Sequence, residues 1–95
     1  MKSYPLEILT PRGKLFSGEV VHTFLPAEDG FVGVLANHAP YVTSSPGGKL
    51  EVRLPAGETR TFRVGTGFFQ ILKNRAFFLT QSVEELSPAS SPSGA

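Results

Sequence analysis

The sequence predicts an all-β domain, and three observations support this fold class. Apolar and polar residues alternate in short segments, the 3.6-residue period of an amphipathic helix is absent, and Gly, Pro or Asn interrupts the pattern about every 8–12 residues. The chain has 95 residues and no cysteine, which suits one small domain without disulfides. We therefore expect a two-sheet β-sandwich of about eight to ten short strands.

The N-terminal part begins with an expected strand over Leu6–Leu9. Thr10–Gly13 suits a type I turn, because proline stands at its second position and glycine at its fourth. The chain then becomes extended again over Lys14–Phe16. Glu19–Leu25 is apolar on both faces, which indicates either a central strand or one covered by a partner, and we favour a central strand. On that strand Val20 and Phe24 would share one face, and Val21 and Leu25 the other.

Two hairpins are expected in the second half. Lys49–Leu54 alternates strictly, and Glu58–Val64 continues it after a turn at Pro55–Gly57, where Gly57 suits a left-handed position. The buried face would carry the apolar residues Leu50, Val52, Leu54, Phe62 and Val64. The second hairpin joins Phe68–Leu72 to Ala76–Thr80 around Lys73, Asn74 and Arg75, and Asn74 is its expected turn residue.

The C-terminal residues predict little regular structure. Val83–Leu86 could form at most one helical turn. Ser87–Ala95 contains only Ser, Pro, Ala and Gly, which bury too little surface to offset the entropy of ordering. We expect a β-sandwich domain over residues 1–86 and a disordered tail over residues 87–95.

The charge of the chain argues against non-specific electrostatic binding. Nine Lys and Arg oppose eight Asp and Glu, so the formal net charge is +1. Positive charge nevertheless concentrates in Lys49–Arg75, where Phe62, Phe68 and Phe69 are interleaved. A single-stranded nucleic-acid-binding β-barrel is therefore the alternative function, and a carbohydrate-binding sandwich is a weaker third.

The segment Gly30–Gly48 contains no charged residue, although the flanking segments do. Gly, Pro, Asn and Ser interrupt it, so part of it must form loops. Uncharged loops with apolar and aromatic members fit the centre of a protein–protein contact. The alternative, that these residues complete the core, is equally compatible with the residues alone.

No catalytic, metal or cofactor site is expected. Two histidines, His22 and His38, are too few for a tetrahedral zinc site, and nearby carboxylates lack ligand spacing. We expect His22 to be a sheet residue and His38 to shape a turn before Ala39-Pro40. Ser44-Ser45 lacks the strand–turn–helix context of a nucleophile.

Several motifs occur in an order that resembles one family. They are Thr10-Pro11-Arg12-Gly13, Phe16-Ser17-Gly18-Glu19-Val20, Leu25-Pro26-Ala27-Glu28-Asp29-Gly30-Phe31-Val32-Gly33-Val34-Leu35, His38-Ala39-Pro40, Ser45-Pro46-Gly47 and Gly65-Thr66-Gly67-Phe68-Phe69-Gln70-Ile71. Together they resemble the N-terminal β-sandwich domain of the epsilon subunit of F-type ATP synthase, which is called delta in mitochondria.

The resemblance implies a non-catalytic subunit of the central rotor. Its expected partners are the gamma subunit and the c-ring, with membrane contact only through the c-ring, on the cytoplasmic face of the bacterial inner membrane. Nucleic acid is not expected as a partner. By resemblance, the partner-binding residues are Phe31, Val32, Gly33, Val34, Leu35, His38, Ala39 and Pro40, with Thr43 nearer gamma.

The C-terminal end departs from the family pattern. Family members commonly continue into a two-helix domain that can bind ATP, but residues 87–95 have no helical periodicity. We therefore expect no ATP binding, and either a naturally short or a shortened epsilon chain.

Overall fold

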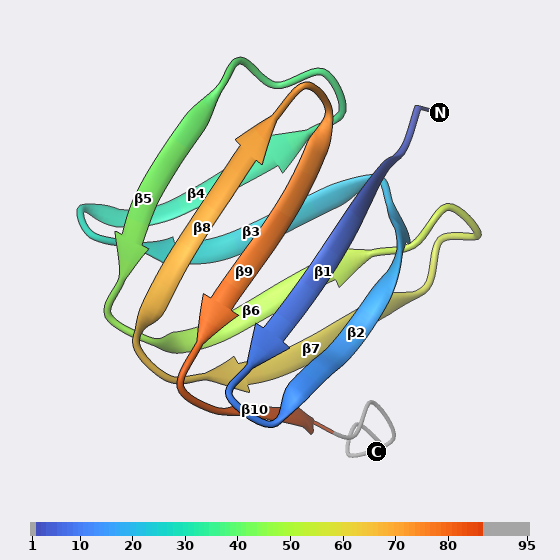
Figure 1. Ribbon diagram of the computed structural model, residues 1–95. Helices are drawn as coiled ribbons and strands as arrows, with labels where there is room; N and C mark the ends of the chain where they lie inside the picture. Colours follow the sequence, from blue (N-terminus) through green and yellow to red (C-terminus); the bar gives the residue numbers. More distant parts are fainter. Residues whose placement is uncertain (1, 87–95) are drawn as a thin grey trace.

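The computed structural model describes residues 2–86, which form ten strands in two stacked five-stranded sheets (Figure 1). The first sheet has the order β2 (Gly13–Val20), β1 (Tyr4–Thr10), β9 (Arg75–Thr80), β8 (Gly67–Leu72) and β5 (Tyr41–Ser45). The second has the order β10 (Val83–Leu86), β7 (Thr59–Val64), β6 (Gly48–Arg53), β3 (His22–Ala27) and β4 (Gly30–Leu35). Neighbouring strands are antiparallel, except that β1 runs parallel to β9. The predicted β-sandwich is confirmed.

Both expected hairpins are present. In β6 and β7, the alternation directs Leu50, Val52, Phe62 and Val64 into the core. Gly57 has a φ of 102° in the turn between them, a conformation that glycine adopts without strain. The β8–β9 turn places Lys73 and Asn74 at φ 51° and 59°, which is the geometry of a two-residue hairpin loop.

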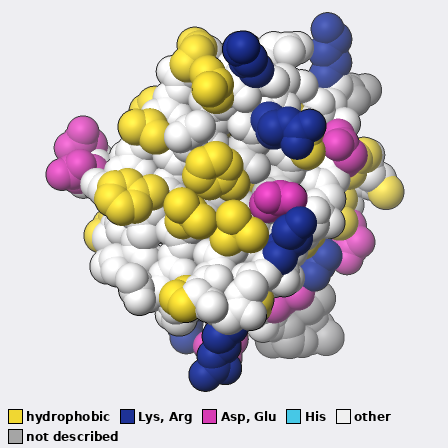
Figure 2. Space-filling view, viewed as in Figure 1, with side chains coloured by type: hydrophobic (Ala, Val, Ile, Leu, Met, Phe, Trp, Pro, Cys, Tyr) yellow, Lys and Arg dark blue, Asp and Glu magenta, His cyan; other side chains and the backbone are white. Residues whose placement is uncertain are grey.

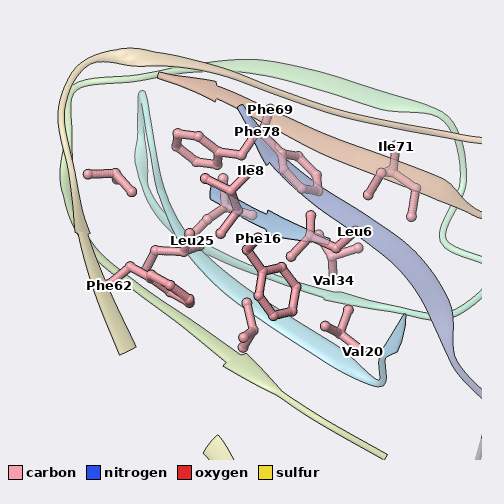
Figure 3. Packing of buried hydrophobic residues seen from close by; sticks show 14 of the residues in the cluster. Leu6, Ile8, Phe16, Val20, Leu25, Val34, Phe62, Phe69, Ile71 and Phe78 are labelled. Atoms are coloured by element: carbon pink, nitrogen blue, oxygen red, sulfur yellow. The ribbon is translucent and has the colours of Figure 1, made fainter. Parts of the chain in front are cut away.

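The core lies between the sheets and takes apolar side chains from both (Figure 3). One polar bridge crosses it. The buried Tyr4 hydroxyl lies 2.6 Å from the Thr23 hydroxyl and donates a hydrogen bond of 2.8 Å to the Val34 carbonyl oxygen. Burial raises the pKa of Tyr4 to about 12, and the Thr23 hydrogen bond partly offsets this. The bridge joins β1 of the first sheet to β3 and β4 of the second.

Two expectations about individual elements are wrong. Glu19–Leu25 is not one strand: β2 ends at Val20, and the chain crosses to the second sheet at Val21, whose amide donates to the Arg53 carbonyl oxygen at 2.8 Å. The crossing breaks the alternation, so Val20 and Val21 are both buried and Phe24 faces outward. Val83–Leu86 is not a helical turn but strand β10, because the edge of β7 offers it hydrogen-bonding partners. The expected tail, residues 87–95, lies outside the described residues.

Candidate partner-binding surfaces

An aromatic surface covers the outer face of the β3–β4 hairpin. The rings of Phe24 and Phe31 are stacked, with centroids 5.2 Å apart and an interplanar angle of 12°, and His22 stacks on Phe24 at 6.4 Å. Gly33 leaves room for the His22 ring, since a Cβ there would lie 2.8 Å from His22 Nε2. Leu35 extends the surface at the far end of β4. Phe31 and Leu35 are 57% and 59% exposed, so this face is apolar and uncovered.

The uncharged segment therefore divides between surface and core. Alternate residues of β4 point to opposite sides of the sheet, and Val34 is fully buried. Val32 is half-buried and packs against the core. Of the predicted contact residues on this strand, only Phe31, Gly33 and Leu35 present themselves on the outer face. Val34 is a core residue.

His38, Ala39 and Pro40 lie in the loop between β4 and β5, at the opposite end of β4 from Phe31. The chain turns there with Asn37 at φ 64°, and the His38 amide donates to the Leu35 carbonyl oxygen at 3.2 Å. His38 Nδ1 lies 2.7 Å from the Ala39 carbonyl oxygen, so His38 does shape a turn. Phe31 and Leu35 are four residue steps apart along β4, which is about 13 Å. The predicted contact residues therefore extend along the whole of β4 and into the loop that follows it.

Thr43 lies on another strand and faces another way. It pairs with Phe69 across β5 and β8, and shares the inward side with that buried ring. Its hydroxyl donates to the Ser44 carbonyl oxygen at 2.9 Å. The neighbouring Val42 points outward instead and is 63% exposed.

A second apolar surface, which we call the β5–β8–β9 face, covers the outer side of the first sheet (Figure 2). The register places Phe68 beside Leu79, and Leu79 beside the half-buried Leu9. The exposed members of this face are Val42, Phe68, Leu72 and Leu79. Sequence reasoning missed it, although β8 and β9 are apolar on both faces, a pattern typical of a strand covered on both sides.

Comparison with known proteins relates the whole folded part to one family. Residues 3–86 match the family model described as ATP synthase, Delta/Epsilon chain, beta-sandwich domain. The chain is 34% identical over 82 residues to the ATP synthase epsilon chain of Chlorobium limicola, covering 86% of this chain and 93% of that one. It is 36% identical over 90 residues to that of Rhizobium meliloti, covering 92% and 67%.

The chain belongs to the ATP synthase delta/epsilon family.

Solved structures with the same fold include chains of two mitochondrial ATP synthases. The match to Euglena gracilis has a TM-score of 0.83 at 20% identity and covers 87% of this chain and 53% of that one. The match to Tetrahymena thermophila has a TM-score of 0.74 at 11% identity and covers 94% and 72%. At these identities the likeness establishes the sandwich fold of the epsilon domain.

The basic segment of this epsilon-family domain does not form one surface. Phe62 and Phe69 are buried, whereas Phe68 lies on the apolar face of the other sheet. The Arg60 guanidinium donates two hydrogen bonds to the Glu85 carboxylate, at 2.7 and 2.8 Å, and Lys49 forms an ion pair with Glu51 at 3.5 Å. Nothing in this arrangement supports the nucleic-acid alternative.

Other kinds of site were also sought in the described chain. Within residues 2–86, no three His, Cys, Asp or Glu side chains gather closely enough to hold a metal ion. The same residues contain no helix that is long and apolar enough to span a membrane.

Proposed function

We propose that this chain is a non-catalytic subunit of the central rotor of an F-type ATP synthase, which joins the gamma subunit to the c-ring during proton-driven ATP synthesis. The observation that carries the proposal is the pair of uncovered apolar surfaces on the outer sides of the two sheets. Two such surfaces suit a small domain held between two partners. A close-packed sandwich deforms little, so it can transmit torque between them.

The assemblies in which its relatives occur support the same role. The Tetrahymena structure is described as central stalk and c-ring, and the Euglena structure includes the c-ring. By analogy this chain lies at the membrane-associated part of the complex. In a bacterium that position is the cytoplasmic face of the inner membrane, reached only through the c-ring.

Each surface has a proposed partner. The outer face of β3–β4, with Phe31 and Leu35, contacts the c-ring, together with Gly33 and the loop residues His38, Ala39 and Pro40. The β5–β8–β9 face, with Val42 and Phe68, contacts gamma, and Thr43 lies on the same strand with its side chain turned inward.

Two substitutions that introduce a negative charge test the proposal. Phe31→Glu and Phe68→Glu each place a carboxylate on one surface, where burial against a partner removes its hydration and costs a few kcal/mol. We expect Phe68→Glu to abolish co-purification with isolated gamma, and Phe31→Glu to spare gamma binding but weaken capture of the gamma–c-ring assembly. Thr59→Glu, on an exposed position opposite Arg53, is the control.

The outcomes separate the two assignments. If Phe31→Glu impairs gamma binding and Phe68→Glu does not, the surfaces have been exchanged. If neither variant affects assembly while wild type assembles, the contacts lie elsewhere on the molecule. Failure of wild type to bind gamma and the c-ring would reject the rotor function itself.

A further inference from the structure

The last strand, β10, is attached to the sandwich much more lightly than the strands beside it. It has four residues, it pairs with β7 alone among the strands of residues 2–86, and none of its side chains is buried. The other edge strand of this sheet, β4, is anchored by Val34, which is fully buried. Val83 is half-buried and packs against the edge of the core, and Leu86 is half-buried. Hydrophobic burial therefore contributes less to keeping β10 in place than it does for β4.

An ion pair between side chains also attaches β10 to β7. The Arg60 guanidinium on β7 donates two hydrogen bonds to the Glu85 carboxylate, at 2.7 and 2.8 Å. The same guanidinium lies over the rings of Phe16 and Phe62, 5.0 and 5.6 Å from their centroids. The two aromatic contacts hold the guanidinium in place without Glu85, and its two parallel N–H groups then match the carboxylate oxygens. Arg60 is thus a preformed receptor for β10.

The turn that leads into β10 is held firmly. The buried Thr80 hydroxyl lies 2.9 Å from the Gly65 carbonyl oxygen and 3.2 Å from that of Ser82. Backbone bonds of 2.9 and 3.1 Å join Gly65 to Ser82 and Gln81 to Thr66. A firmly held turn followed by a lightly held strand lets the strand open from a fixed anchor, and we call β10 the strap.

We propose that β10 opens as a unit from the turn at Gln81–Ser82, which stays in place, and is held closed by the Arg60–Glu85 ion pair, while the other nine described strands remain folded. Opening exposes the edge of β7 and the Phe16–Arg60–Phe62 stack. It also frees the four residues of β10, which span about 13 Å when extended. The strap is a conformational device of the domain and does not depend on the proposed rotor contacts.

Native-state amide hydrogen exchange of the full chain tests the strap. We expect the amides bonded between β7 and β10 to exchange at least about tenfold faster than those bonded between β3 and β4, with a weaker dependence on denaturant. Glu85→Gln should accelerate only the β7–β10 amides, by about fivefold. Glu84→Gln is the matched control, because Glu84 pairs in register with Arg63 and points to the outer side.

Two results would overturn the proposal. One is exchange of the β7–β10 amides at the rate and denaturant dependence of global unfolding. The other is an equal effect of Glu84→Gln and Glu85→Gln. As a second measurement, Val64→Cys/Val83→Cys joins two directly paired positions in a chain without native cysteine. The oxidised variant should slow these amides at least tenfold, and unchanged exchange would also reject the strap.

Discussion

Tyr4 couples the two sheets through its hydroxyl, at the centre of an otherwise apolar core. Its ring is fully buried, and its hydrogen-bonding partners belong to β3 and β4 of the opposite sheet. A buried hydroxyl without partners would be costly, so the bridge specifies how the sheets stack as well as holding them together. The β3–β4 hairpin that carries Phe31 depends on it for its position.

We expect Tyr4→Phe to lower the free energy of unfolding by about 1–3 kcal/mol, because the Thr23 hydroxyl and the Val34 carbonyl oxygen lose a buried partner. Urea unfolding of the free chain measures this. Tyr41→Phe, at a half-buried tyrosine of β5, is the control and should cost less than about 0.5 kcal/mol. Equal costs for both variants would contradict a special role for Tyr4.

The raised pKa of Tyr4 also predicts a loss of stability in alkali. The folded chain holds the phenolic proton up to a pKa of about 12, whereas the unfolded chain releases it near 10. Between these values the folded state binds more protons, so stability falls as pH rises, by at most about 1.4 kcal/mol per pH unit. Below pH 10 this contribution is fully present. Unfolding free energies from pH 9 to 12 should fall less steeply in Tyr4→Phe, and parallel curves would contradict the assignment.

Among the elements, the β8–β9 turn both reverses the chain and holds a neighbouring loop. Its central residues, Lys73 and Asn74, both have positive φ, a conformation that costs energy for residues other than glycine. Asn74 compensates: its Oδ1 accepts from the Asn37 amide at 2.6 Å, and its Nδ2 donates to the Ser3 carbonyl oxygen at 3.3 Å. The turn therefore fastens the β4–β5 loop to the rest of the sandwich.

The side-chain hydrogen bonds of Asn74 predict that replacement by glycine has opposite effects at positions 73 and 74. Lys73→Gly should raise the free energy of unfolding by about 0.5 kcal/mol, because glycine removes the strain of positive φ at a small entropic cost. Asn74→Gly should lower it by about 1 kcal/mol, since two hydrogen bonds are lost. Thermal unfolding of the two variants makes the comparison. A stabilising Asn74→Gly would show that those bonds contribute nothing.

At the scale of the whole molecule, the residues that stabilise the fold lie between the sheets, and those proposed to bind partners lie on the outer faces. Phe68 and Phe69 are neighbours in sequence, yet Phe69 is fully buried and Phe68 is 59% exposed on the β5–β8–β9 face. We expect Phe69→Ala to cost about 3–5 kcal/mol of unfolding free energy by leaving a cavity. Phe68→Ala should cost less than about 0.5 kcal/mol in the free chain.

Urea unfolding of the free chain and a pull-down with gamma distinguish the two roles. Phe68→Ala should weaken gamma binding without moving the urea midpoint. If it destabilises the free chain as much as Phe69→Ala, the outer face contributes to folding and the separation fails.

The sequence by itself determined the fold class, most strands and the two hairpins. These depend on the two-residue alternation of strands and on turn residues such as Gly57 and Asn74, which act over a few positions. It also marked Gly30–Gly48 as unusual, and the exposed Phe31 and Leu35 belong to that segment.

Only the tertiary structure decided which side is covered in the strands that are apolar on both faces. Val34 and Leu35 are both apolar, and nothing local distinguishes the core residue from the exposed one. The crossing at Val21, the strand at Val83–Leu86 and the β5–β8–β9 face likewise depend on neighbours distant in the chain. The physical reason is that burial and edge pairing are contacts between segments, and a local pattern specifies which residues can make them but not which partner they meet.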